Sequence, residues 1–252
     1  MDLGLESRIC LVSGASAGIG RGVVKTLAQE GAQTIAVARR TNLLEELADE
    51  VAETGAPRPI VMAGDLSKAD GPGEIAAQAL DRFGRVDVVV NNAGQSLGTQ
   101  WDAPDELWTG AFDLNFHAAR RLTTALIPAM KANQWGRIVN ITGGMEVGGL
   151  NAALTGKAAT HLWAKGLSRA LGRDAITVNC IIPGRINSEQ ILGRVHADPV
   201  ERAAFIEREI PAGYFGDPED LAVLVAFLAS AQARYISGEV MRVDGGMYRY
   251  AH

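Results

Sequence analysis

Seven short apolar runs recur along this chain, and longer segments with a helical spacing of apolar residues separate them. The runs cover residues 9–12, 34–38, 59–62, 86–90, 137–141, 176–182 and 239–243. Because most residues of these segments are apolar, strands formed from them need cover on both faces of their sheet. Right-handed helical crossovers between successive strands make those strands parallel. The alternation therefore predicts an α/β fold: a Rossmann-like, doubly wound, mostly parallel seven-stranded sheet with helices on both faces.

Length and charge indicate one domain that binds a small molecule. The 252 residues contain no linker-like or repetitive stretch, so we expect residues 1–252 to form a single domain. A net charge of −5 provides no basic field, and we expect neither nucleic acid nor a membrane as a partner. Cys10 and Cys180 stand in apolar runs as buried thiols, and we find no secretory leader or membrane-spanning run. These features favour a cytoplasmic protein.

The stretch between the sixth and seventh predicted strands includes 32 residues without a strand signal, residues 187–218. Its segment 199–210 is rich in Glu, Arg and Ala, which favour a helix. Because helices placed over a sheet edge often close over substrate, we predict a substrate lid at residues 187–218. Arg185, Arg194, His196 and Arg202 are candidate anion contacts in or beside it, or parts of solvated helix faces.

A glycine-rich turn follows the first predicted strand and leads into a helical segment. It reads Ser13-Gly14-Ala15-Ser16-Ala17-Gly18-Ile19-Gly20. Gly14 permits a tight turn, Gly18 lets backbone amides approach a pyrophosphate, and Gly20 lets helix and strand pack closely. We assign Gly14, Ser16, Gly18, Ile19 and Gly20 to a dinucleotide site, with a plain strand-to-helix turn as the alternative.

The residues after the second predicted strand bear on the choice of dinucleotide. An acidic side chain there would bind the 2′-hydroxyl of NAD(H), whereas arginine would bind the 2′-phosphate of NADP(H). The sequence has Arg39 followed by Arg40 and no acid. It therefore favours NADP(H) over NAD(H), with Arg39 the better candidate for the 2′-phosphate and Arg40 the second, and with a solvated pair of arginines at a helix start as the alternative.

Further motifs stand at the carboxyl ends of later predicted strands, where open α/β sheets bind ligands. They are Gly64-Asp65-Leu66, Asn91-Asn92-Ala93-Gly94, Pro183-Gly184 and the segment from Gly238 to Gly246. Together with the glycine-rich turn, these motifs resemble the short-chain dehydrogenase/reductase family over essentially the whole chain. The resemblance implies a homotetramer, or a homodimer, in which the helices around Asn115 and Lys157 pack between subunits.

The resemblance also implies a set of cofactor contacts along one sheet edge. They are Asp65 and Leu66 at the adenine, Asn91, Ala93 and Gly94 along the adenosine ribose and its neighbouring backbone, Pro183 and Gly184 in the wall of the nicotinamide pocket, and Ile186 and Ser188 near the nicotinamide amide. Lys157 would hold the hydroxyls of the nicotinamide ribose. For Asn91 to Gly94 we expect a second role in stabilising the central sheet.

The family's catalytic set is an asparagine, a serine and a tyrosine followed four residues later by a lysine. Asn115 and Lys157 match two of these positions. Ala153 stands where the tyrosine belongs, and Gly143 where the serine belongs. The chain has four tyrosines, at 214, 235, 248 and 250, and none is near Lys157 in sequence. We therefore expect the chain to lack both the family's tyrosine, which acts as the acid, and the serine that assists it.

Substitutes for the missing groups are sought between the fifth predicted strand and Lys157. Thr142 could take the polar role of the serine, and Glu146 is the one ionisable residue of that loop. Both have ordinary alternatives, because strand-end threonines bond backbone and loop carboxylates are usually solvated. We expect His117 and His161 to pack rather than to catalyse, and Tyr214 to be structural. Trp101, Trp108, Gln95 and Ser96 are candidates for the pocket wall or for ordinary packing.

Three functions follow from this pattern. The first is an NADP(H)-dependent oxidoreductase that transfers hydride to or from a small carbonyl, enone or imine with an atypical proton donor. The second is a cofactor-binding protein without redox activity, and the third is a non-redox lyase on the same scaffold. Losing a general acid costs on the order of 10² to 10⁴ in rate, and positioning alone can supply more. We therefore favour the oxidoreductase, and we expect no metal.

Overall fold

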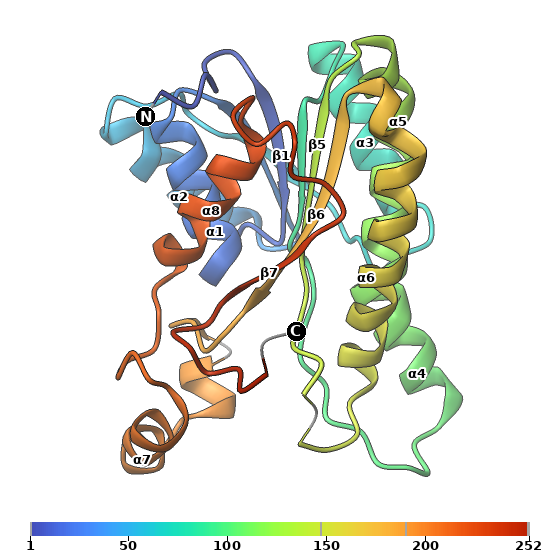
Figure 1. The fold of residues 1–252 in the computed structure, drawn as a ribbon. Helices are drawn as coiled ribbons and strands as arrows, with labels where there is room; N and C mark the ends of the chain where they lie inside the picture. Colours follow the sequence, from blue (N-terminus) through green and yellow to red (C-terminus); the bar gives the residue numbers. More distant parts are fainter. Residues whose placement is uncertain (1, 147, 190, 251–252) are drawn as a thin grey trace.

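The computed structural model describes residues 2–146, 148–189 and 191–250. These residues form one parallel sheet of seven strands in the order β3-β2-β1-β4-β5-β6-β7 (Figure 1). The strands are β1 (Ile9–Ser13), β2 (Gln33–Ala38), β3 (Ile60–Ala63), β4 (Val88–Asn91), β5 (Gly136–Ile141), β6 (Ile176–Pro183) and β7 (Val240–Val243). Their ends lie within two residues of the predicted ones. The predicted doubly wound sheet is confirmed, and every strand pairing in it is parallel.

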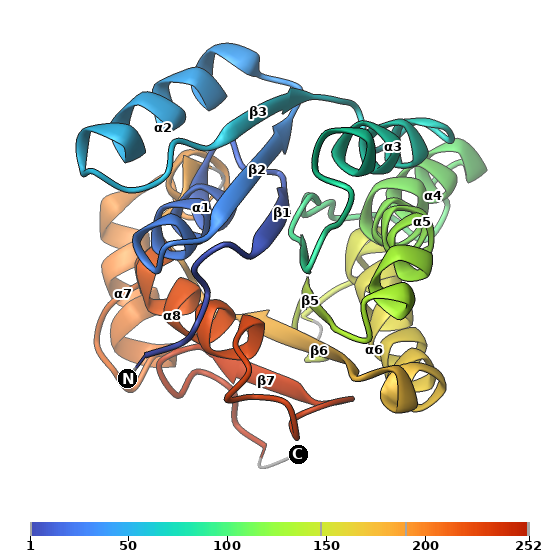
Figure 2. The same cartoon turned by 90° about the horizontal axis from the view of Figure 1, so that it is seen from above.

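Helices cover the sheet in two layers (Figure 2). One layer holds α1 (Gly18–Gln29), α2 (Thr41–Glu53) and α8 (Pro218–Ala229). The other holds α3 (Gly71–Phe83), α5 (Ala118–Ala132) and α6 (Ala152–Leu171), and α4 (Asp105–Phe112) packs against α6. A separate buried apolar cluster lies under each layer, which explains why the strands are apolar on both faces. No helix within the described ranges is long and apolar enough to cross a membrane.

The sheet winds in opposite directions from β1. β2 and β3 lie on one side of it, and β4 to β7 lie on the other. The connections that leave β1 and β4 therefore turn to opposite faces, and a crevice opens between them at the carboxyl ends of the strands. The change in winding direction between β1 and β4 therefore fixes where a ligand site can form.

Asn115 lies in a π-helical turn, Asp113–His117, between α4 and α5. Its side-chain Nδ2 donates a hydrogen bond to the carbonyl oxygen of Ala111 at 2.9 Å. A π-helical turn interrupts the regular i→i−4 ladder, and such turns are frequent at functional sites. This local change in helix geometry directs Asn115 towards the loop that follows β4.

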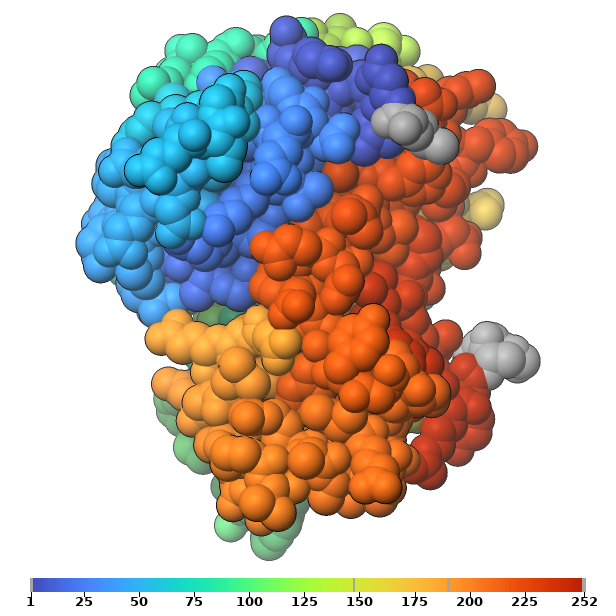
Figure 3. Space-filling model, turned by 90° about the vertical axis from the view of Figure 1, so that its left-hand side faces the viewer, coloured from blue at the N-terminus to red at the C-terminus, as the bar shows by residue number. Residues whose placement is uncertain are grey.

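The region predicted as a lid contains a π-helical turn, Ile191–Val195, and α7 (Pro199–Glu209). The helix predicted at 199–210 is therefore confirmed to within one residue, while residue 190 lies outside the described residues. The His196 ring packs against Phe205 and Phe215, with centroids 4.4 and 5.2 Å away. Figure 3 shows this region as an orange lobe beside the red C-terminal segment.

Candidate active site

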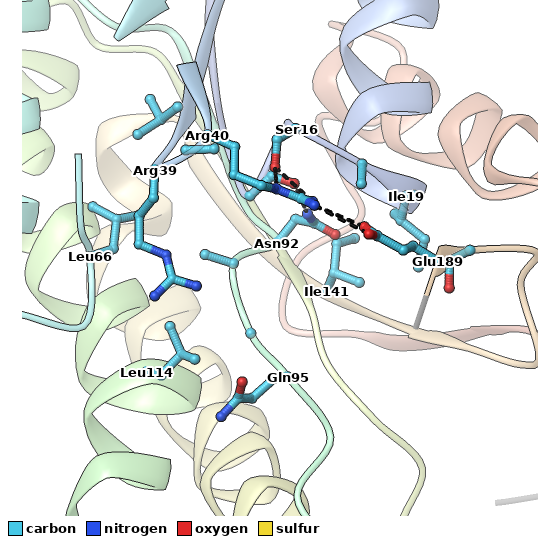
Figure 4. Close-up of a pocket in the computed structure, with 18 of the residues that line it drawn as sticks. Ser16, Ile19, Arg39, Arg40, Leu66, Asn92, Gln95, Leu114, Ile141 and Glu189 are labelled. Atoms are coloured by element: carbon cyan, nitrogen blue, oxygen red, sulfur yellow. Dashed lines mark hydrogen bonds and ion pairs between the residues drawn. The ribbon is translucent and has the colours of Figure 1, made fainter. Parts of the chain in front are cut away.

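A cavity of about 360 Å³ opens at the crevice (Figure 4). Its walls come from the turn after β1, the end of β2 and the loops after β3, β4 and β6, with Leu114 and Lys157 from the helical layer. Thirteen predicted cofactor residues line it: Gly14, Ser16, Gly18, Ile19, Arg39, Arg40, Asp65, Leu66, Ala93, Gly94, Lys157, Pro183 and Ser188. Nine further residues complete the wall: Ala17, Val37, Ala38, Gly64, Asn92, Gln95, Leu114, Ile141 and Glu189. The fold thus brings together segments that lie between residues 14 and 189 of the chain.

Glycine geometry shapes the floor of this cavity. Gly14 and Gly18 have φ values of +66° and +55°, in the left-handed region that other residues rarely adopt. A Cβ on Gly20 would fall 2.5 Å from Nδ2 of Asn92 and against the carbonyl oxygen of Gly14. α1 begins at Gly18, and no side chain caps its N-terminus. Its first backbone amides are therefore free to bind an anion such as a pyrophosphate.

Ser13 and Asn92 fasten the turn after β1 to the loop after β4. The Ser13 hydroxyl oxygen accepts hydrogen bonds from the backbone N–H groups of Asn92 and Ala93, at 2.9 and 3.0 Å. The Asn92 side chain donates to the carbonyl oxygens of Ser13 and Gly14, at 3.0 and 3.1 Å. The sequence analysis assigned no cofactor contact to Asn92, although this residue lies within the motif Asn91-Asn92-Ala93-Gly94. Its role becomes visible only when the two loops lie side by side.

Four predicted cofactor residues lie behind the cavity wall instead of lining it: Gly20, Asn91, Gly184 and Ile186. Asn91 is buried, and its Nδ2 donates to Thr123 Oγ1 and Asn140 Oδ1, both at 2.9 Å. It holds the sheet together, which is the second role expected for it. A Cβ on Gly184 would meet Cα of Asp244 at 2.5 Å, so this glycine allows the backbones after β6 and β7 to approach closely.

Ile186 departs furthest from its expected place. It is 3% exposed, forms a backbone bridge with Gly216 and lines a separate cavity of about 150 Å³. Tyr214 lines the same second cavity and not the one that contains Lys157. A direct contact between the Ile186 side chain and a ligand in the main cavity does not fit this placement.

Two arginines follow β2, and they point in different directions (Figure 4). Arg40 donates from Nε and Nη2 to Oγ of Ser16, both at 3.3 Å, and from Nη1 to Oε2 of Glu189 at 3.0 Å. Arg39 turns towards the loop after β3. There the pKa of Asp65 is lowered, chiefly by the hydrogen bond from the Ser67 hydroxyl, and also by the charge of Arg39.

Lys157 reaches the cavity from α6. Its Nζ donates to the carbonyl oxygen of Thr142 at 3.2 Å, and a Cβ on Gly94 would stand 3.7 Å from the same atom. No carboxylate of the described residues forms an ion pair with it. Burial without a counter-charge lowers the pKa of Lys157 to about 8. Asn115, 5% exposed, accepts a hydrogen bond from the backbone N–H of Gln95 at 3.1 Å and so braces the neighbouring loop.

Leu154 occupies space beside Gly143. A Cβ on Gly143 would lie 2.6 Å from Cδ2 of Leu154 and 3.4 Å from Cδ of Lys157. Ala153, four residues before Lys157, is fully buried. A hydroxyl-bearing side chain at position 143 therefore requires Leu154 to move. The surroundings of Lys157 here are apolar on the side of positions 143 and 154.

Thr142 and Glu146, the predicted substitutes for the serine and the tyrosine, do not line the cavity. Thr142 is 2% exposed, and its Oγ1 donates to the carbonyl oxygen of Ile181 at 3.2 Å and lies 2.7 Å from Nε2 of His161. Burial and the charge of Arg242 lower the pKa of His161, which packs beside Thr142 outside the cavity wall. Glu146 is exposed in its loop and does not line the cavity.

Of the four residues predicted as candidates for the pocket wall after β4, one lines the cavity. Gln95 lines the cavity, whereas Trp101 is 86% exposed, and Ser96 and Trp108 do not line it. Within the described residues, no three His, Cys, Asp or Glu side chains gather as metal ligands.

The seven-stranded parallel sheet agrees with the comparison of this chain with known families. Residues 14–248 match the family model described as enoyl-(acyl carrier protein) reductase. The chain belongs to the short-chain dehydrogenase/reductase family, a family of oxidoreductase enzymes.

Individual relatives cover almost the whole chain. It is 35% identical over 250 residues to the 3-oxoacyl-[acyl-carrier-protein] reductase FabG of Escherichia coli (strain K12), covering 98% of this chain and 99% of that protein. The L-sorbose reductase of Gluconobacter frateurii, solved with NADPH and L-sorbose, superposes with a TM-score of 0.92 at 30% identity over 99% of this chain and all of that one. YwfH, an NADPH-dependent reductase involved in bacilysin biosynthesis, gives 0.90 at 30% identity over 97% of this chain and all of that one.

Proposed function

We propose that this protein is an NADP(H)-dependent reductase that acts on a small carbonyl, enone or imine and uses a proton donor other than tyrosine. The observation that carries the proposal is the cavity itself, in which an uncapped helix N-terminus, two arginines and a desolvated lysine line one crevice. A dinucleotide needs these groups at its phosphates and ribose, and a reducible substrate needs a positive charge at its reacting end.

The residues present fit the cofactor. Gly14 and Gly18 leave space that a Cβ would fill, and the amides at the start of α1 would bind the pyrophosphate. Asp65 and Leu66 would lie at the adenine, and Lys157 at the nicotinamide ribose. When bound, the cofactor supplies the hydride.

The phosphate at the 2′ position is the reason to prefer NADP(H) over NAD(H). Arg39 and Arg40 line the cavity at the end of β2, and Ser16 adds a hydroxyl beside Arg40. An arginine binds a phosphate through paired, charge-assisted hydrogen bonds, which a ribose hydroxyl cannot match. The similar L-sorbose reductase and YwfH are both described with NADPH, which supports the same preference here.

Lys157 is the proposed proton donor. Its ammonium would give a proton to the oxygen, nitrogen or enolate carbon that gains electrons when hydride adds to the substrate, and the resulting amine would regain a proton from water. A pKa of about 8 makes such a donor effective near neutral pH, because the group is still protonated and releases its proton readily. The Thr142 carbonyl fixes the ammonium. Thr142 and Glu146, also predicted to act, are less well placed for this step.

Gly143, Ala153 and Leu154 add no second proton donor beside Lys157, which favours acceptors that are already activated towards hydride. Conjugated enones accept hydride at carbon, and the enolate that forms takes its proton from Lys157. Positioning of hydride and acceptor can then supply most of the acceleration. We therefore place activated acceptors first among the three substrate classes.

One observation favours a second candidate, a cofactor-binding protein without redox activity. Leu154 fills space next to Gly143, and Ala153 and Gly143, which we assign to the positions of the family's tyrosine and serine, carry no side chain that can donate a proton. Such a protein would bind NADP(H) and leave it unchanged. The non-redox lyase receives no comparable support.

The assembly and the compartment are also proposed. We infer a homotetramer, or a homodimer, in the cytoplasm, with residues 187–218 as the lid. Leu162 on α6 is 80% exposed, and a subunit interface along this helix would bury it.

Label transfer tests the proposed reaction. The protein is incubated with NADPH that carries deuterium at the transferable position and with pooled ketones, enones, imines and cell-extract metabolites, and the products are read by mass spectrometry. A deuterated product supports the reductase. Bound NADPH with no deuterated product would favour the second candidate, and turnover without NADPH would favour the lyase.

Variants of two lysines on α6 make the test specific. Lys157→Met should abolish most of the transfer. Lys165→Met should leave it unchanged, because Lys165 lies outside the cavity and binds the Gly238 carbonyl and Glu239.

A further inference from the structure

An ion pair crosses the mouth of the cavity at the end that holds Arg40. Nη1 of Arg40 lies 3.0 Å from Oε2 of Glu189 and 3.4 Å from Oε1, and the two residues are 149 positions apart in the chain. Their side chains are 45% and 70% exposed. A pair this exposed contributes little to stability, so a competing anion can separate it at small cost. The effect of this ion pair on ligand binding in the cavity is therefore larger than its effect on stability.

Arg40 is engaged on two sides, and both partners face the cavity (Figure 4). Nε and Nη2 bond to Oγ of Ser16, while Nη1 holds the Glu189 carboxylate. A guanidinium beside a hydroxyl is a good site for a phosphate, and carboxylate and phosphate oxygens bind to guanidinium in the same paired manner. In this structure the anion at that site is the protein's own carboxylate.

Glu189 is held near this position by its neighbour. Ser188 packs on the glycine-rich turn, where a Cβ on Gly18 would lie 3.1 Å from Cβ of Ser188, and the Ser188 hydroxyl accepts a hydrogen bond from the N–H of Ile191 at 3.2 Å. The backbone next to Glu189 is thus tied to the floor of the cavity. This anchor keeps the Glu189 carboxylate within hydrogen-bonding distance of Arg40 in this structure.

We propose that Glu189 is a specificity-determining residue that competes with the 2′-phosphate of NADP(H) for Arg40 and Ser16. The inference rests on the function proposed above, because it assumes that a dinucleotide occupies the cavity. A 2′-phosphate has to displace the carboxylate, whereas a cofactor with a 2′-hydroxyl leaves the ion pair in place. Glu189 therefore reduces the preference for NADP(H) over NAD(H) that Arg40 would otherwise give.

Binding measurements test this without any substrate. Dissociation constants for NADPH and NADH are measured by calorimetry for the wild type, Glu189→Gln, Arg40→Ala and the double variant. Glu189→Gln should tighten NADPH binding by about three- to tenfold and change NADH binding by less than about twofold. Arg40→Ala should weaken NADPH binding by about ten- to a hundredfold, and in its presence Glu189→Gln should have no further effect.

A matched variant controls for the change in net charge. Glu207→Gln removes a carboxylate from exposed α7 outside the cavity, and it should leave both dissociation constants unchanged. Equal NADPH binding by the wild type and Glu189→Gln would overturn the inference alone, as would a gain that persists in the Arg40→Ala background. Failure of the wild type to bind either dinucleotide would overturn the proposed function together with the inference.

Discussion

Lys157 is the residue on which the proposed chemistry depends. Its side chain is half-buried and lines the cavity, no carboxylate of the described residues pairs with its ammonium, and its anchor is the carbonyl oxygen of Thr142 at 3.2 Å. A charged group in such surroundings loses hydration, which favours the neutral amine. In the proposed mechanism, this lowered pKa is what allows Lys157 to act as the acid.

We predict that Lys157 titrates near pH 8, well below the ordinary pKa of a lysine side chain. The chain has five, at 25, 68, 131, 157 and 165, so ¹⁵N-lysine labelling gives a spectrum simple enough to assign with single Lys→Arg variants. The Nζ signal of Lys157 should have its midpoint near pH 8, because burial lowers its pKa to about 8. A midpoint at or above pH 10 would show that the ammonium is well solvated and would remove the basis for its role as an acid.

The contact between position 143 and Leu154 gives a second prediction at the scale of single residues. Gly143→Ala places a Cβ 2.6 Å from Cδ2 of Leu154 and should lower the free energy of unfolding by about 1 kcal/mol, as measured in urea. Gly144→Ala, where nothing lies within 4 Å, should change it by less than about 0.5 kcal/mol. In a Leu154→Ala background the cost at position 143 should disappear. An equal cost in both backgrounds would mean that Leu154 is not the obstacle.

Sequence reasoning identified residues through motifs and missed those that act across the fold. The glycine-rich turn and the arginines after β2 could be assigned because each motif carries its own chemistry. Glu189 could not, because its partner lies 149 residues away and no local pattern marks it. Asn91 and Ile186 were placed at the correct strand ends, but which way a side chain points there depends on packing that the sequence does not display.

At the scale of elements, the strands were the most predictable part. Runs such as residues 88–90 are buried on both faces of the sheet, and this burial produces a continuous apolar signal in the sequence. The π-helical turn Asp113–His117 had no such signal, because shifting one hydrogen bond does not change composition. The element that positions Asn115 is therefore one that the sequence alone does not show.

The packing of α1 against α8 should be sensitive to a single methyl group. Gly22 is buried, and a Cβ there would lie 2.6 Å from Cβ of Pro218 at the start of α8. Gly22→Ala should therefore lower the free energy of unfolding by about 1–3 kcal/mol in urea. Gly166→Ala, on the exposed side of α6 with nothing within 4 Å, should raise it by about 0.5–1 kcal/mol. If both substitutions stabilise the protein, the close approach of α1 and α8 is absent in solution.

At the scale of the whole molecule, the doubly wound topology explains why distant segments share one cavity. β1 and β4 are neighbours in the sheet although 77 residues separate Ser13 and Val90, which a hydrogen bond joins. Their connections turn to opposite faces, so the crevice between them is built into the fold. Chemistry then depends on which side chains the loops and α6 contribute, and here they contribute one lysine and no phenol to the described wall.

The central claim is that this reductase delivers its proton from Lys157. The most direct measurement follows single-turnover deuteride transfer from labelled NADPH to the acceptor found by label transfer, between pH 6 and 10. The account predicts a rate constant that is level below pH 8 and falls about tenfold per pH unit above it, as the ammonium with a pKa of about 8 loses its proton. Lys157→Met should be slower by about 10² to 10⁴ at neutral pH, and Glu146→Gln should match the wild type. A rate that stays level through pH 9, or a Lys157→Met variant as fast as the wild type, would contradict the claim.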